Sequence, residues 1–271
     1  MTIKSPLSSR MRLALSVLSV VALAGAYEVL SSAQHARNPS DTTMPSLRQM
    51  TKAVVQIVTP DEVGRIWLWE DFTATFSRHA AGLICGAFLS VILGIAMGCF
   101  SMVEAVFLPP LSFFAKVPST AMLAVFFILT GTGMTMFTAM IAFGVLPTLT
   151  QAIYQTVKYD VHEELIHKAY TLGATSWEVI TCVIFDSILP RLLEAVRLQI
   201  GPAMVCLIAA EYAMADVGFG FRLRLQSRQL NMAVVYDYLL VLGAMGFIMD
   251  HSMCRLREYL CPWFDVRKGN S

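Results

Sequence analysis

The stretch RHAAGLICGAFLSVILGIAMGCF, residues 78–100, decides the fold of this chain. Residues 79–100 contain no Asp, Glu, Lys or Arg, and about 20 mostly apolar residues are enough for a helix to cross a bilayer. The spacings Gly82-x-x-x-Gly86 and Gly94-x-x-x-Gly98 let two membrane helices approach closely. The stretch therefore predicts a membrane-spanning helix with one close-packed face.

The composition of the whole chain agrees with a membrane protein. Of its 271 residues, 56% are hydrophobic and only 14% are charged, and the mean hydropathy is +0.62. Soluble domains carry about 25% charged residues, so a water-soluble enzyme is excluded. The formal net charge is +1, which creates no global field for nucleic acid. We expect an all-α integral membrane protein in contact with lipid, with no nucleic-acid partner.

Outward from residues 78–100, the hydropathy pattern predicts six membrane-spanning helices. The first, 13–30, follows a short N-terminus of residues 1–12, and we expect it to be retained. Cleavage after the small residues 24–26 is the alternative. Residues 31–77 are polar and include a short amphipathic helix that we expect on the membrane surface. The other spans are expected at 78–100, 111–131, 134–157, 192–214 and 232–253, followed by a tail, 256–271.

The distribution of Lys and Arg predicts the orientation. Segments on the side of the N-terminus hold twelve of the 20 basic residues, and segments on the other side hold eight. Because basic residues concentrate in cytoplasmic loops, both termini are predicted to be cytoplasmic and residues 31–77 periplasmic.

The apolar stretch 103–131 is interrupted twice, at Pro109-Pro110 and at Lys116-Val117-Pro118. Irregular backbone at membrane depth is tolerated only inside protein or beside a water-filled cavity. Lys116 and Pro118 are therefore candidates for a transport pathway. The alternative for Lys116 is that its side chain extends to the inner headgroups.

Residues 158–190, called the elbow here, are too highly charged to lie in lipid. Helical spacing places apolar residues on one face of a short helix, which Gly173 ends, and Thr175 or Ser176 can cap a second helix. A solvated loop is the alternative to a docking site. The candidate docking residues are Val161, Glu164, Leu165, Ala169, Leu172, Gly173, Leu189 and Pro190.

Four charged residues toward the other side of the membrane are further candidates. Glu211 lies near the end of a span, where an acid usually faces a cavity or a partner, so it is a candidate gate. Its alternative is an interfacial acid satisfied by nearby backbone. Arg222, Arg224 and Arg228 form a basic loop that would attract an anionic solute or contact a binding protein, or would simply be solvated. The histidine and cysteine spacings predict no metal site.

The elbow resembles the cytoplasmic loop of bacterial ABC importer permeases, the binding-protein-dependent inner-membrane components. Their loop reads Glu-Ala-Ala, three residues, Gly, nine residues, Ile-x-Leu-Pro. Ala169 and Gly173 match it, whereas His167-Lys168 and Phe185-Asp186 depart from it. Outside the loop, three features are similar to the nitrate, sulfonate, taurine and bicarbonate branch: Val117-Pro118, Ala210-Glu211 and Gly218-x-Gly220.

The resemblance covers roughly residues 71–264, with a core at 72–255, and implies a six-helix type I permease fold like that of the methionine importer. It implies a second permease copy, two ATP-binding subunits docked on the elbows, and a periplasmic or lipid-anchored binding protein. The solute would be a small anion or organic acid. The chain lacks a Gly-x4-Gly-Lys-[Ser/Thr] loop, so we expect it to bind no cofactor, with ATP and Mg²⁺ on the partner subunit. The alternatives are an ion-gradient-driven secondary transporter and an intramembrane enzyme.

Overall fold

The computed structural model describes residues 8–38, 42–62 and 64–265, and every regular element within these ranges is helical. The chain divides into two compact units, each formed from two stretches of sequence. Unit 1 contains residues 1–67 and 225–239, and unit 2 contains residues 68–224 and 240–271. Lys4, Arg267 and Lys268, which contributed to the predicted orientation, lie outside the described residues.

Unit 1 contains α1 (Ser9–Arg37) and α2 (Leu47–Val58). A capping box between Ser46 and Gln49 fixes the start of α2. This helix buries Met50, Ala53 and Ile57, while a second apolar stripe, including Val54 and Val58, stays exposed. An amphipathic helix with an exposed apolar stripe is the pattern expected at a membrane surface.

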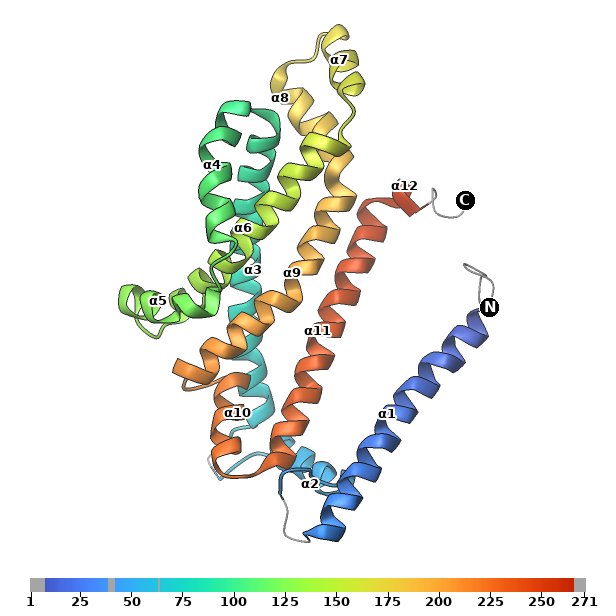
Figure 1. The fold of residues 1–271 in the computed structure, drawn as a ribbon, viewed down its shortest axis with the longest axis vertical. Helices are drawn as coiled ribbons and strands as arrows, with labels where there is room; N and C mark the ends of the chain where they lie inside the picture. The colour runs from blue at the N-terminus through green and yellow to red at the C-terminus, as the bar shows by residue number, and fades with distance from the viewer. Residues whose placement is uncertain (1–7, 39–41, 63, 266–271) are drawn as a thin grey trace. The chain divides into compact units, whose positions relative to one another are not determined.

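Unit 2 contains most of the helices, and α10 and α11 continue from one unit into the other. Figure 1 shows α6 and α9 side by side, with α7 and α8 projecting beyond their ends. The helices are α3 (Trp67–Cys99), α4 (Ser101–Phe114), η1 (Ser119–Met122), α5 (Leu123–Thr130), α6 (Met134–Asp160), α7 (Glu163–Thr171), α8 (Ser176–Glu178), η2 (Val179–Ile184), α9 (Phe185–Met214), α10 (Phe219–Arg228), α11 (Met232–Leu260) and α12 (Pro262–Asp265).

The glycines of α3 pack against α6. A Cβ added at Gly82 would lie 2.5 Å from the Cβ of Ile141, so only glycine permits this approach. Since the contact partners advance together along both helices, the two helices run parallel. The close contact predicted from the glycine spacing is confirmed, and its four glycine contacts are Gly82 with Ile141, Gly86 with Val145, Gly94 with Ile153 and Gly98 with Val157.

Helical structure extends beyond the expected pattern in two places. Helix α3 begins at Trp67, before the span expected from residue 78, and the expected basic loop that carries Arg222, Arg224 and Arg228 is part of helix α10 rather than a loop. In both segments some of the polar residues that suggested solvent exposure are buried against each other, as Asp71 and Arg222 are. Hydropathy alone does not detect such pairing, because it scores each residue as if it faced lipid or water.

Of the two interruptions expected in residues 103–131, only the one at Lys116-Val117-Pro118 is present. Pro109 and Pro110 lie inside α4, and the chain bends by 86° only after that helix, between α4 and the η1–α5 segment. Pro190 likewise lies inside α9, which continues without interruption from α8 and the π-helical turn η2. Residues 176–214 therefore form one helical rod, roughly 55–60 Å long at 1.5 Å per residue.

Among the described residues, four helices are long and apolar enough to span a membrane, and the bent pair α4 with η1–α5 makes a fifth. Helix α9 is not among them, and its first half carries Arg191, Glu194 and Arg197. Counting α9 as a span gives the six membrane spans expected from the sequence, and this total stays a prediction.

Candidate functional site

The elbow turns sharply at Gly173. This residue has φ +88°, in the left-handed region that favours glycine, and Ala174 N–H donates to the carbonyl oxygen of Ala169 at 3.1 Å. Thr175 then caps the second helix, in a capping box with Glu178. The hydrogen bonds from Thr175 hold the pKa of the Glu178 carboxyl below its ordinary value. The helix, turn and cap predicted from the sequence are all present.

The elbow exposes large apolar side chains. Leu172 is 88% exposed and Trp177 is 72% exposed, and Leu165 and Tyr170 are also exposed. Val161, at the base of the elbow, is instead buried in the core of unit 2. Apolar side chains clustered on an exposed surface are typical of a contact with another protein.

The remaining elbow candidates divide into two groups. Glu164 is exposed on α7, 3.8 Å from Lys168, and Ala169 is half-buried. Leu189 and Pro190 lie within α9, half-buried and buried respectively, so they support the rod rather than contribute to the exposed surface.

At the opposite end of the same rod, Glu211 is completely buried. Its carboxylate accepts hydrogen bonds from Thr75 Oγ1 at 2.9 and 3.0 Å, from Arg78 Nη1 at 2.8 Å and from Gly220 N–H at 3.0 Å. Arg78 also donates to the carbonyl oxygen of Val217 at 2.7 Å. A buried charge needs such compensation, and each of these partners comes from α3 or from the residues after α9.

A second buried ion pair lies beside Glu211. Asp71 Oδ2 accepts from Arg222 Nε at 2.7 Å, and Asp71 Oδ1 accepts from Gly218 N–H at 2.9 Å. A Cβ at Gly218 would lie 2.6 Å from Glu211 Oε1, and one at Gly220 would lie 2.5 Å from the carbonyl oxygen of Ile208. Both glycines are therefore required where the chain turns over Glu211.

We call Asp71, Thr75, Arg78, Glu211 and Arg222 the carboxylate cluster. It joins α3, α9 and α10 through groups with no contact to solvent except at Arg78 and Arg222, which are nearly buried. Sequence reasoning proposed Glu211 and Arg222 but missed the three residues on α3. Their spacing at 71, 75 and 78, one side of a helix, was the available signal.

The three arginines of the expected basic loop have different environments. Arg222 is buried in the cluster, and Arg224 donates to the carbonyl oxygens of Ala213 and Ala215, at 2.8 Å each. Arg228 is exposed. The structure thus gives two of these arginines a role in holding the chain after α9.

A third set of charges joins the first half of α9 to α11. Arg197 donates to both carboxylate oxygens of Asp250, at 2.6 and 2.8 Å, and to Glu194 at 2.9 Å. Arg257 donates to the other oxygen of Glu194 at 2.9 Å. A bidentate arginine pair with a shared acid fixes the rotation of one helix against the other.

The predicted pathway residues lie at the 86° bend. Lys116 and Pro118 are both exposed, Lys116 after the end of α4 and Pro118 at the start of η1. The next residue, Ser119, lies between α6 and α9, where its hydroxyl donates to Cys206 Sγ at 3.1 Å. The break is thus packed against protein on one side and open on the other.

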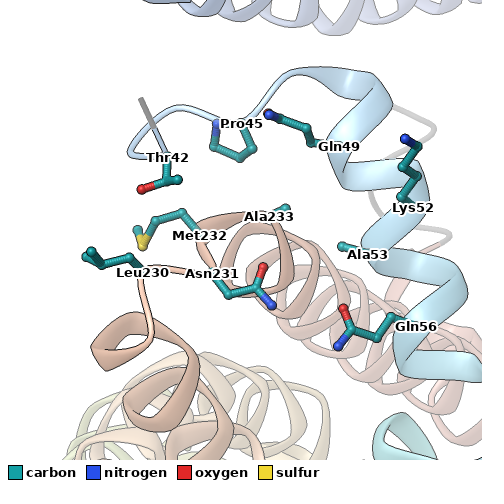
Figure 2. A pocket seen from close by; sticks show the side chains of 10 residues that line it. All are labelled: Thr42, Pro45, Gln49, Lys52, Ala53, Gln56, Leu230, Asn231, Met232 and Ala233. Atoms are coloured by element: carbon teal, nitrogen blue, oxygen red, sulfur yellow. The ribbon is translucent and has the colours of Figure 1, made fainter. Parts of the chain in front are cut away.

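Unit 1 has a separate pocket of about 280 Å³, lined by both polar and apolar side chains. Figure 2 shows Gln56 of α2 and Asn231 facing one another across it, with Gln49 and Lys52 on the α2 side. Leu230, at its edge, is 64% exposed and has φ +57°, which is strained for a leucine. Nothing in the sequence pattern predicts this pocket.

Comparison with known proteins identifies the class of this chain. Residues 86–264 match the family of binding-protein-dependent transport system inner membrane components, and the chain belongs to that family. It is an inner-membrane permease subunit of an ATP-driven importer, working with a substrate-binding protein and a separate ATPase subunit.

Two relatives refine this comparison. The taurine transport system permease protein TauC of Escherichia coli (strain K12) is 26% identical over 220 residues, covering 81% of this chain and 80% of that protein. The putative aliphatic sulfonates transport permease protein SsuC of Bacillus subtilis (strain 168) is 25% identical over 193 residues, covering 71% of this chain and 69% of that protein.

The fold agrees with the family. A chain of the inward-facing MetNI methionine ABC transporter aligns with TM-score 0.57 and 17% identity, covering 78% of this chain and 97% of that chain. The expected type I importer permease fold is confirmed. These findings give no support to a secondary transporter.

Proposed function

We propose that two copies of this permease form a pathway for a small organic anion, and that the elbow of each copy docks on an ATP-binding subunit in the cytoplasm. ATP and Mg²⁺ would be bound by that partner alone. The exposed apolar side chains of the elbow, above all Leu172 and Trp177, are the observation that carries the docking assignment.

Docking on the elbow would move the permease through the helical rod of residues 176–214. Because α8, η2 and α9 are continuous, a displacement at Trp177 is transmitted along the whole helix rather than absorbed in a loop. The carboxylate cluster would hold the far end of the rod at Glu211, so that the elbow end moves more than the cluster end.

The contact between the two permease copies would include α5. Its eight residues, LAVFFILT, are all apolar except the last, and none of them is buried within the described chain. Leu123 and Phe126 are half-buried against the core of unit 2, and the other apolar side chains of this helix need either lipid or a second protein surface. We assign α5 to both, with one side against the partner copy.

The names of the relatives suggest the solute. TauC and SsuC are named for taurine and aliphatic sulfonates, which share a sulfonate group, so a small sulfonate or similar organic anion is the first choice here. The binding protein would approach the periplasmic side, where the exposed Arg228 and the pocket of unit 1 are candidate contacts.

Cysteine labelling tests the orientation on which this proposal rests. Single cysteines at Thr175 and Ser227, in a cysteine-free background, are treated with an impermeant thiol reagent in intact cells. We expect labelling at position 227 in intact cells, and at position 175 only after the cells are opened. Labelling of position 175 from outside would contradict the cytoplasmic elbow.

A further inference from the structure

Part of α6 exposes polar side chains at membrane depth. Gly144, Thr148, Gln151 and Gln155 follow one another at spacings of four, three and four residues, which places them on one side of the helix. Thr148 and Gln155 are exposed and Gln151 is half-buried. Since polar side chains are unfavourable against hydrocarbon, this side of the helix is unsuited to lipid.

Hydrogen bonds connect this polar side of α6 to its two neighbours. Thr148 Oγ1 donates to Gln199 Oε1 of α9 at 3.2 Å, and Gln151 Nε2 donates to Ser112 Oγ of α4 at 3.4 Å. A Cβ at Gly144 would lie 3.0 Å from the hydroxyl oxygen of Ser119. Both sides of the 86° bend, Ser112 before it and Ser119 after it, therefore contact the same side of α6.

The segment between Ser112 and Ser119, at the 86° bend, carries one charged residue. Lys116 is the only charged residue between positions 105 and 157, and it lies four residues after Ser112, in the turn that follows α4. Its side chain is exposed, and within the described part of the chain its ammonium group has no ion pair or hydrogen bond. Arg197, the only charged residue between positions 195 and 210 of α9, is already paired with Asp250 and Glu194.

We propose that Lys116 with Ser112, Thr148, Gln151 and Gln199 forms an anion-binding station in the transport pathway. The inference rests on the proposed function, since it assumes that the open side of this surface faces water. One ammonium group and several neutral amide and hydroxyl donors suit a singly charged group such as a sulfonate. These donors bind the anionic group without a high density of positive charge, so the anion can also dissociate.

Thiol chemistry tests the station without the natural solute. The full-length permease is purified with its ATPase subunit, with its six native cysteines replaced by alanine and one cysteine placed at Thr148 or Gln151. Reaction rates are measured with anionic sulfonatoethyl methanethiosulfonate and cationic trimethylammonioethyl methanethiosulfonate. Thr175→Cys on the elbow is the exposed control, and a protein retaining only Cys85, exposed on the apolar side of α3, is the control for a lipid-facing thiol.

We expect the thiols introduced at positions 148 and 151 to react faster than Cys85. We also expect the ratio of the anionic to the cationic reaction rate to be higher at these two positions than at the elbow thiol of Thr175→Cys. In Lys116→Gln this preference should fall by about threefold to tenfold, because removing one charge slows the anion and speeds the cation. Lys116→Arg should retain it.

Two results would overturn the station. The first is slow reaction at both positions while the elbow thiol of Thr175→Cys reacts normally, and the second is a preference unaffected by Lys116→Gln. If the ATPase subunit still copurifies in these preparations, either result refutes the station and leaves the proposed function standing. If the ATPase subunit fails to copurify with a permease whose elbow residues are native, the proposed function itself is refuted.

Discussion

The two ends of the rod formed by residues 176–214 differ in how completely their side chains are satisfied. At Glu211 each carboxylate oxygen has hydrogen-bond donors and the group is fully buried. At the elbow, Leu172 and Trp177 are largely exposed and pack against little of the chain. The comparison indicates that the side chains at one end of the rod are paired within the chain, whereas those at the other end form a surface for a partner. Mutations at the two ends should therefore fail in different ways.

The largest effect is expected from Glu211→Ala. Removing one member of a buried ion pair leaves Arg78 without its acid, at a cost of about 3–5 kcal/mol. We expect most of the permease to disappear from the membrane, measured by quantitative immunoblotting. Glu211→Gln, which retains an acceptor oxygen for Thr75 and Arg78, should lose less. Normal abundance of Glu211→Ala would show that the cluster does not hold this end of the rod.

A smaller and different effect is expected from Leu172→Asp. The side chain is already exposed, so abundance in the membrane should stay near normal, whereas a charge in an apolar contact should reduce copurified ATPase at least tenfold. Tyr259→Asp is the matched control, since Tyr259 is 82% exposed near the end of α11 and lies outside the elbow. Equal losses of ATPase in both variants would remove the distinction between elbow and ordinary surface.

The smallest effect concerns pH. Hydrogen bonds from Thr175 lower the pKa of Glu178 in the folded elbow, so the ionised carboxylate stabilises the cap above its unfolded pKa and this contribution is lost as pH falls through the folded value. In Glu178→Gln, ATPase binding should lose the part of its decrease that occurs below about pH 4.3, the ordinary glutamate pKa, because the pKa of this carboxyl in the folded elbow is lower than that. An unchanged pH profile would show that the capping box does not contribute to docking.

The same comparison explains what could be read from the sequence. The elbow was predictable in detail because its structure is local: Gly173, Thr175 and the apolar spacing all lie within a few turns of helix. Glu211 was identified as unusual, but its partners were not, because Thr75 is 136 residues away and its α3 segment reads as polar loop. Long-range pairing turned that segment and α10 into buried helix.

The polar side of α6 was missed for a related reason. Thr148, Gln151 and Gln155 do not lower the hydropathy of the span enough to attract notice, and the role of Gln199 depends on which helix it faces. A helical plot of α6 alone would have revealed the three residues on one side. Their connection to Ser112 required the structure.

The central claim is that the turn at Gly173 presents the elbow to an ATPase subunit, and a pair of matched variants tests it most directly. Gly173 and Gly64 have φ of +88° and +80°, and a Cβ would meet nothing within 4 Å at either position. Gly173→Val and Gly64→Val therefore impose a similar backbone penalty, but only the first redirects the elbow. Copurified ATPase per permease in the membrane is the measurement. We predict a loss of at least tenfold in Gly173→Val and little change in Gly64→Val, with both permeases near normal abundance. Full ATPase binding by Gly173→Val would contradict the account.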